Sequence, residues 1–127
     1  MKVQVLHNQA RDAAGRHPAW DTGYEPGHPL CEVFAYETPD AAPQTVAERA
    51  FWLFNVGDEP AQGADPTAVA YRRRQLRSLS IGDVLVLTGS QHCADGPAYA
   101  CGRWGWTQVA LEMSLVTRAT RPGIEAE

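Results

Sequence analysis

Apolar and polar residues alternate or cluster in ways that predict a sheet. In residues 2–8 (KVQVLHN), the two valines and the histidine alternate with polar residues and leucine, which predicts an edge or half-buried strand. Residues 30–38 are rich in β-branched and aromatic side chains and predict a second strand. The apolar run at 83–88 lies between two glycines and predicts a buried strand. Residues 98–102 and 104–111 predict two further strands joined at Gly102 and Arg103.

The clearest helical pattern spans about residues 45–55. Thr45 and Glu48 have the spacing of a capping box, and Gly57 lies where a left-handed residue would end the helix. Helical spacing places one set of apolar residues on a single face and predicts that this face is buried. The predicted core-facing residues are Ala47, Ala50, Phe51 and Phe54, widened by Val46 and Leu53.

A second, short helix is predicted to begin after Asp65 and to end near Arg73. Asp65 is a favourable N-cap, and Pro66 suits the first turn. Together these elements predict a small α+β single domain, a mostly antiparallel sheet packed against one main helix and a short second helix. This domain is expected to span residues 1–119, followed by a flexible tail at 120–127.

Residues 10–29 contain three glycines and three prolines and predict a long ordered loop. Long loops in small domains are often functional or mobile. We expect Trp20 and Tyr24 to fold back from this loop onto the core, because exposed aromatic rings are unfavourable. Residues 91–97 predict a polar turn.

Composition narrows the class of protein. The chain has 127 residues, of which 44% are hydrophobic and 20% charged, an ordinary balance for a folded domain. Its formal net charge of −4 is unlike that of a highly basic nucleic-acid coater, and it is not acidic enough for a DNA mimic. The longest aliphatic run, residues 84–87, is too short to cross a membrane, and the N-terminus lacks the pattern of a signal peptide. We therefore expect a cytoplasmic protein with no membrane association; the pattern carries no signal for its oligomeric state.

Histidine and cysteine residues are the candidate metal ligands. His28 and Cys31 are separated by two residues in the manner of a zinc pair, and His92, Cys93 and Cys101 could complete a site. No second pair has a zinc-knuckle spacing, and buried cysteine commonly behaves as a small apolar residue. We therefore expect no metal site and no cofactor.

Catalytic patterns are weak. Ser78, Ser80, Asp83 and His92 could be combined into a nucleophilic set, but no strand–turn–helix nucleophile elbow surrounds either serine. Cys93 has no basic cluster in sequence that would activate its thiol. Phosphate-binding glycine motifs are absent from the sequence. A non-enzymatic protein is expected; the enzymatic alternative requires Ser80, Asp83 and His92 to converge in a pocket.

A basic run follows the second predicted helix. Arg72, Arg73, Arg74 and Arg77 lie within six positions, and Tyr71 precedes them. Arginine recognises phosphate and carboxylate groups well, and a tyrosine can stack on a base. The simpler interpretation is a solvated helix end, where positive charge complements the helix dipole. The alternative is a nucleic-acid-binding module that uses the arginine cluster at 72–77.

Two tryptophans flank Gly105. In a strand, Trp104 and Trp106 would share one face, because side chains alternate between the faces of a sheet. They could form an exposed stacking platform or cover the helix that carries Phe51 and Phe54. Core packing is the favoured interpretation, because aromatic side chains dominate core burial.

Three sequence blocks together resemble the YodL-like domain family. They are LFNV at 53–56, SLSIGDVL at 78–85 and WGWTQV at 104–109. The resemblance covers about residues 45–110, and the order of the blocks is more specific than any one of them. The chain is also similar to small proteins of actinobacterial plasmids and integrative elements.

The resemblance implies a mobile-element setting and no particular chemistry. Gly82 stands where much of the family has serine, residues 58–70 are longer than usual, and the loop at 10–29 has no family counterpart. From the residues themselves, the 78–83 turn is expected to be held by serine and aspartate hydrogen bonds and by the conformational freedom of Gly82.

The sequence therefore predicts a non-enzymatic accessory binding protein of a mobile genetic element, with a role in element transfer or counter-defence. Its partner is expected to be a protein or a nucleic acid. A recognition surface is hypothesised to consist of Arg72, Arg73, Arg74, Arg77, Ser78, Ser80 and Asp83.

Overall fold

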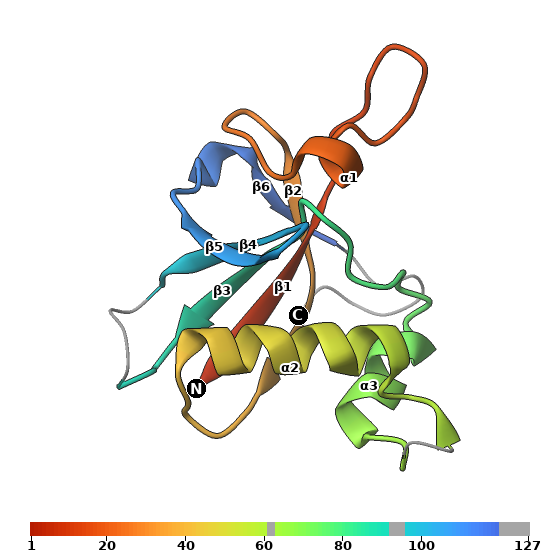
Figure 1. Ribbon diagram of the computed structural model, residues 1–127, viewed down its shortest axis with the longest axis vertical. Helices are drawn as coiled ribbons and strands as arrows, with labels where there is room; N and C mark the ends of the chain where they lie inside the picture. The colour runs from red at the N-terminus through yellow and green to blue at the C-terminus, as the bar shows by residue number, and fades with distance from the viewer. Residues whose placement is uncertain (61–62, 92–95, 120–127) are drawn as a thin grey trace.

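Six strands form one mixed sheet at the centre of the structure (Figure 1). The computed structural model describes residues 1–60, 63–91 and 96–119. The strands follow the order β5-β4-β3-β1-β2-β6, in which β6 runs parallel to β2 and all other neighbours are antiparallel. They are β1 (Lys2–Asn8), β2 (Leu30–Glu37), β3 (Val84–Thr88), β4 (Ala98–Gly102), β5 (Gly105–Val109) and β6 (Val116–Arg118).

Two main helices cover one face of this sheet. The helix α2 (Pro43–Val56) lies across the strands, and α3 (Pro66–Arg73) packs beside its C-terminal end (Figure 1). The short helix α1 (Ala19–Thr22) lies within the loop after β1, and a 3₁₀ turn, η2 (Met113–Leu115), precedes β6. The predicted α+β single domain with a mostly antiparallel sheet is confirmed. No helix of the described residues is long and apolar enough to span a membrane.

The core has two parts, one on each side of the sheet. The larger part joins the sheet to α2 and α3, and its centre is an aromatic group of Phe34, Phe54 and Tyr71. The smaller part lies on the opposite face around Leu6 and Leu30. Apolar burial on both faces explains why a sheet of short strands is stable in so small a domain.

The first strand is central rather than at an edge. β1 pairs with both β2 and β3, so the edge position, one of the two predicted alternatives, is wrong. Val3 and Val5 pack into the larger core, and Leu6 packs into the smaller core. Because both faces of β1 are covered, the strand needs apolar residues on each of them.

The main helix differs from its prediction at both ends. α2 begins at Pro43, which occupies the first turn, and its N-cap Ala42 makes no side-chain bond, so the predicted capping box is wrong. Gly57 has an ordinary helical φ of −67° rather than a left-handed one. A Cβ there would lie 2.6 Å from the Leu53 carbonyl oxygen, so Gly57 is needed for close packing. The predicted buried stripe is confirmed except for Phe51, which is exposed.

The predicted helix α3 is confirmed, whereas the position of Trp20 and the strand β6 differ from prediction. α3 spans Pro66–Arg73, and the Asp65 side chain caps it by accepting a hydrogen bond from the Thr67 backbone N–H. Tyr24 packs against the smaller core, but Trp20 remains 41% exposed, contrary to expectation. The strand β6 was not predicted. The predicted tail at 120–127 lies outside the described residues, as does most of the polar turn at 91–97.

Candidate functional site

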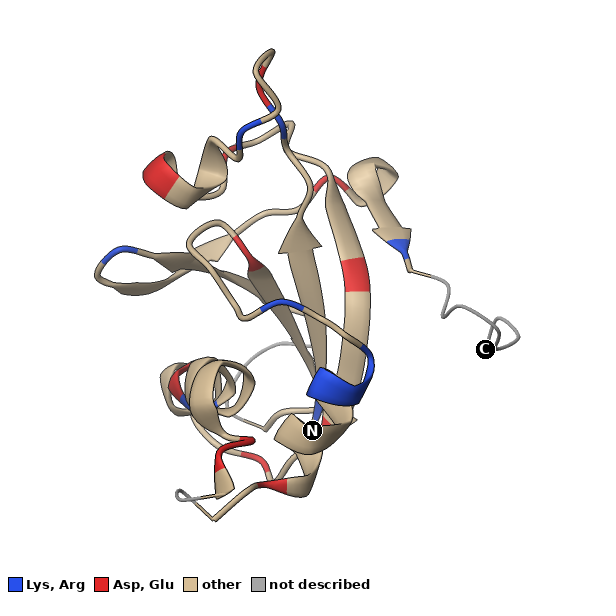
Figure 2. Cartoon of the chain, turned by 90° about the vertical axis from the view of Figure 1, so that its right-hand side faces the viewer, with Lys and Arg blue, Asp and Glu red and all other residues tan. Residues whose placement is uncertain are grey.

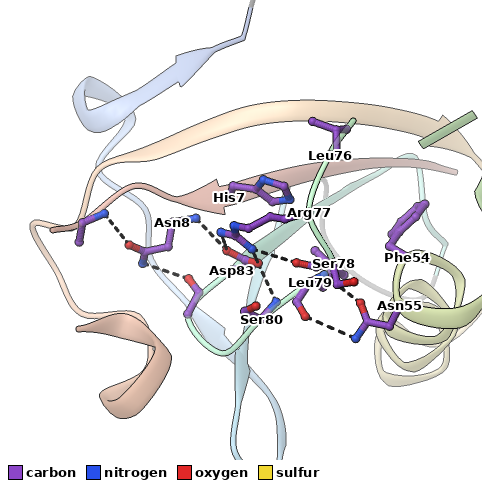
Figure 3. Close-up of polar contacts among 12 residues, drawn as sticks. His7, Asn8, Phe54, Asn55, Leu76, Arg77, Ser78, Leu79, Ser80 and Asp83 are labelled. Atoms are coloured by element: carbon purple, nitrogen blue, oxygen red, sulfur yellow. Dashed lines mark hydrogen bonds and ion pairs between the residues drawn. The ribbon is translucent and has the colours of Figure 1, made fainter. Parts of the chain in front are cut away.

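Asp83 is the centre of a buried polar network where β1 ends and β3 begins (Figure 3). Its Oδ1 accepts hydrogen bonds from the Asn8 backbone N–H (2.8 Å) and from Arg77 Nη2 (2.8 Å). Its Oδ2 accepts from the Ser80 backbone N–H (2.8 Å) and from Arg77 Nη1 (2.6 Å). The fully buried carboxylate is thus paired with a bidentate guanidinium and with two backbone donors. Asp83 fastens the 80–83 turn, as the sequence predicts.

Asn8 joins this network to the long loop. Its Nδ2 donates to the Gly82 carbonyl oxygen (3.1 Å) and lies 3.2 Å from His28 Nδ1. Its Oδ1 accepts from the Ala10 backbone N–H (2.9 Å). The start and the end of the 10–29 loop therefore both contact Asn8, which in turn binds the turn before β3.

His7 and Tyr71 continue the network into the larger core. The Tyr71 hydroxyl donates to the Arg77 carbonyl oxygen at 2.6 Å. His7 Nε2 lies 2.7 Å from the same hydroxyl, whose only proton is already donated to Arg77, so Nε2 is the donor in this contact. Burial lowers the pKa of His7 to about 4 and raises the pKa of Tyr71, which keeps both side chains uncharged at neutral pH.

Arg72 also forms hydrogen bonds with groups inside the domain. Its Nη2 donates to the Phe54 carbonyl oxygen (2.8 Å) and to Ser78 Oγ (2.6 Å), and its Nη1 donates to the Leu76 carbonyl oxygen (3.1 Å). Arg72 Nε lies 3.8 Å from an oxygen of Asp58. The guanidinium therefore binds a carbonyl oxygen near the C-terminal end of α2, where the helix dipole favours a cation.

Asn55 connects two of the sequence blocks on which the family resemblance rests. Its Oδ1 accepts from the Leu79 backbone N–H (2.8 Å), and its Nδ2 donates to the Leu79 carbonyl oxygen (3.4 Å), as Figure 3 shows. Leu79 is buried in the larger core. The asparagine at the end of α2 and the Ser-Leu-Ser segment therefore form one structural unit.

The arginine cluster is divided by these contacts. The guanidinium groups of Arg72 and Arg77 are bound within the domain, whereas Arg73 is exposed. Arg74 is half-buried, with its guanidinium carbon 5.6 Å from the centre of the Phe34 ring. A binding role for the cluster stays a prediction, and the contacts give Arg72, Arg77, Ser78 and Asp83 structural roles.

A cleft of about 420 Å³ lies next to the network, between α1, α2, the turn before β3 and the β4–β5 hairpin. Figure 2 shows this hairpin projecting between α1 and α2. We call it the aromatic cleft; it is lined by Trp20, Phe51, Ser80, Ile81, Cys101, Gly102 and Arg103. Trp20 is 41% exposed and Phe51 is 40% exposed, and Trp104, beside Arg103 in the hairpin turn, is 95% exposed.

The two tryptophans of the hairpin have opposite environments. β5 begins at Gly105, so Trp104 lies in the turn and does not share a face with Trp106. Trp106 is 8% exposed and packs in the larger core. The favoured interpretation of core packing is therefore confirmed for Trp106 and wrong for Trp104.

The network also supports one wall of the aromatic cleft. The Trp20 ring stacks on His17 with ring centres 3.9 Å apart, and the Arg77 guanidinium carbon lies 5.7 Å from the Trp20 ring centre. Gly82 has φ of +95°, and a Cβ there would lie 2.5 Å from Ala19 Cβ. The glycine thus supplies the unusual backbone conformation that the sequence predicts and also allows α1 to approach the turn.

The predicted catalytic groups are only partly brought together. Ser80 lines the aromatic cleft, but Asp83 is sealed behind it by four hydrogen bonds, two of which form its ion pair with Arg77. Burial raises the pKa of the Cys101 thiol to about 11, and the nearby Asp83 charge adds to this shift, so the thiolate is disfavoured. His92 and Cys93 lie outside the described residues.

The candidate metal ligands do not converge where the structure describes them. Among the described residues, no three His, Cys, Asp or Glu side chains come together to hold a metal ion. His28 Nδ1 lies 3.2 Å from the Glu25 backbone nitrogen and contacts Asn8, so it takes part in the loop's own hydrogen bonds. Cys31 is half-buried in β2, and Cys101 is buried in β4.

Comparison with known proteins finds no family model, no curated protein and no solved structure that matches the chain. The resemblance to the YodL-like family therefore stays a prediction.

The aromatic cleft was not predicted from the sequence. Phe51 lies at the rim of the buried stripe of α2, where a helical pattern alone does not separate core from surface. A weaker signal for Trp104 was present, because Arg103 and Trp104 lie between Gly102 and Gly105, and glycine within a strand pattern often marks a tight bend. That pattern places Trp104 at a hairpin tip rather than in a strand.

Proposed function

We propose that the chain is a non-enzymatic accessory binding protein of a mobile genetic element, which acts in the cytoplasm by binding a partner protein. The observation that carries this proposal is the exposure of Trp20 and Phe51 in one cleft, with the exposed Trp104 next to the cleft residue Arg103 in the hairpin turn. Large apolar side chains that gather on a surface are typical of interaction sites.

The composition of this surface favours a protein partner. Tryptophan and arginine are among the residues most enriched in the energetically dominant contacts of protein interfaces. The aromatic cleft combines Trp20 and Phe51 with Arg103, and Trp104 extends the surface along the hairpin. The helix α2 holds the backbone of Phe51, and the paired strands β4 and β5 hold that of the hairpin, which lowers the entropy lost on binding.

The mobile-element setting rests on the resemblance of three sequence blocks to the YodL-like family. In that setting, a small binding protein would act in element transfer or against host defence. The non-enzymatic assignment is supported by the contacts of Asp83, which leave its carboxylate no access to a substrate, and by the raised pKa of Cys101.

The alternative, nucleic-acid binding through the arginine cluster at 72–77, has less support. Phosphate binding needs several accessible cations, and affinity then falls steeply with salt. Arg72 and Arg77 already donate to groups within the domain. We therefore expect that, in a titration with an oligonucleotide at low salt, replacing Arg73 does not change the affinity of the chain for the oligonucleotide.

Partner capture with matched variants tests the proposal. The tagged chain is incubated with a lysate of cells that carry the element, beside Phe51→Ser, Trp104→Ser and Met113→Ser variants. Met113 is the control, because it is 70% exposed and belongs neither to the lining of the aromatic cleft nor to the hairpin turn. The expected result is a protein that the original chain and Met113→Ser retain and that both Phe51→Ser and Trp104→Ser lose. Equal retention by all four proteins would contradict the proposal.

A further inference from the structure

The apolar walls of the aromatic cleft come from three different segments. Trp20 belongs to α1, Phe51 to α2, and Ile81 to the turn before β3. The cleft volume of about 420 Å³ is near the lower end of the range for ligand pockets. Such a cleft has room for one large apolar side chain with its neighbouring backbone.

The described lining of the cleft carries positive charge only. Of the described residues that line it, Arg103 alone is charged and none is acidic. The nearby Arg77 guanidinium is already paired with Asp83 at 2.6 and 2.8 Å. Arg103 is therefore the cation that an incoming group would meet, and a guanidinium favours a carboxylate held in its plane.

We infer that the aromatic cleft binds a short acidic peptide segment of the partner protein. One large apolar side chain of that segment packs against Trp20 and Phe51, and an adjacent Asp or Glu pairs with Arg103. The exposed Trp104 covers the same segment from the hairpin tip. This inference rests on the proposed function and names the chemistry of its partner.

Two observations favour a peptide over a single-stranded nucleic acid. The Trp20 ring already stacks on His17 and has the Arg77 guanidinium over it, so a base would compete with these contacts for the ring. A bound strand also needs a row of cations along its backbone, whereas the described lining of the cleft offers Arg103 alone, on a chain of net charge −4.

Selection from a random peptide library tests the inference and does not require an identified partner. The full chain is immobilised, and phage-displayed short peptides are selected on it, with the Phe51→Ser variant used to remove peptides that bind elsewhere. We expect the retained peptides to share a Trp, Phe, Leu or Ile next to Asp or Glu. A retained peptide is then synthesised, and its affinity is measured by fluorescence anisotropy.

A charge reversal isolates the role of Arg103. Arg103→Glu should weaken the affinity for the acidic peptide by about fivefold or more, because the variant loses one ion pair and adds repulsion between two negative charges. Arg73→Glu is the matched control, because Arg73 is exposed and lies outside the cleft, and it should leave the affinity unchanged. Selection on Arg103→Glu should retain peptides with Lys or Arg in place of the acidic residue.

The contrary outcomes are distinct. Peptides that depend on Phe51 but show no acidic preference would overturn this inference and leave the proposed function intact. If no selected peptide depends on Phe51 or Trp104, this inference is overturned, and the proposed function is still decided by the partner capture. An oligo(dT) probe that binds the cleft instead of a peptide would overturn the proposed protein partner as well. A dimer in sedimentation that Trp104→Ser dissociates would assign the cleft to a second copy of the chain and overturn the peptide assignment.

Discussion

The guanidinium carbon of Arg77 lies 5.7 Å from the centre of the Trp20 ring. The same guanidinium makes a bidentate ion pair with the fully buried Asp83. One arginine therefore joins the interior polar network to a wall of the aromatic cleft. The position of Trp20, and with it the shape of the cleft, depends on an ion pair that lies behind the cleft surface.

The first prediction concerns this ion pair. Arg77→Met leaves the Asp83 carboxylate buried without its cation, and we expect the free energy of unfolding to fall by about 3 kcal/mol or more. Urea unfolding followed by circular dichroism measures the loss. Arg49→Met is the control, because the Arg49 side chain is 53% exposed in its pair with Asp65. That exposed pair should contribute less than about 1 kcal/mol, so equal losses in the two variants would contradict the role given to Arg77.

The second prediction concerns the turn before β3. Gly82→Ala adds a Cβ at φ of +95° and 2.5 Å from Ala19 Cβ, so it combines backbone strain with a steric overlap. We expect a loss of about 3 kcal/mol in the free energy of unfolding. Gly15→Ala has φ of +78° with open space around the new methyl group, and should lose only about 1 kcal/mol. A Gly82→Ala variant as stable as Gly15→Ala would show that α1 does not press on the turn.

The third prediction concerns pH. Burial, the main cause, lowers the pKa of His7 from its ordinary value of 6.5 to about 4. Between these values the unfolded chain binds a proton that the folded chain does not, so stability falls as pH decreases from 6.5 to 4. The full difference amounts to about 3 kcal/mol.

Unfolding by urea across that pH range checks this account. His7→Gln keeps a donor for the Tyr71 hydroxyl but has no titrating group, so its stability should fall less steeply with acid than that of the original chain. Parallel curves for the two proteins above about pH 5, where most carboxylates remain charged, would exclude His7 as the source of the acid sensitivity.

The fourth prediction separates the two tryptophans of the hairpin. Trp104 is 95% exposed, so Trp104→Ser should change the free energy of unfolding by less than about 0.5 kcal/mol. Trp106 is 8% exposed in the core, so Trp106→Ala should lose about 3 kcal/mol. Thermal unfolding of both variants measures the contrast, and a large loss in Trp104→Ser would mean that Trp104 supports the fold.

Local patterns predicted most of the secondary structure, because each strand and helix follows from a few neighbouring residues. The Asp65 cap fixed the start of α3, and the apolar run at 83–88 became a strand buried on both faces. The alternation of apolar and polar residues in β1 does not show that this strand lies at the centre of the sheet. Leu6 was the available signal, since an apolar residue on the otherwise polar face of a strand indicates that both faces are covered.

The polar network could not be predicted in the same way. Asp83 was recognised as a residue that fastens its turn, but its pairing with Arg77 and Asn8 joins a turn, a loop and the end of another strand. No helical or strand period relates these positions, so the tertiary fold alone brings them together. The arginine cluster stands out in the sequence by its charge, yet in the fold Arg72 donates to carbonyl oxygens of α2.

Site-specific crosslinking tests the central claim, that the aromatic cleft and the hairpin tip bind a partner protein. A photo-crosslinking amino acid with an aromatic ring replaces Trp104 in one protein, so that position 104 keeps an aromatic side chain, and replaces Met113 in another. Both proteins are irradiated in cells that carry the element. Both sites are exposed, so a partner that collides at random would react with each of them. The account predicts one discrete adduct from position 104, lost on Phe51→Ser, and none from position 113. No adduct at position 104, or the same adducts from both positions, would contradict it.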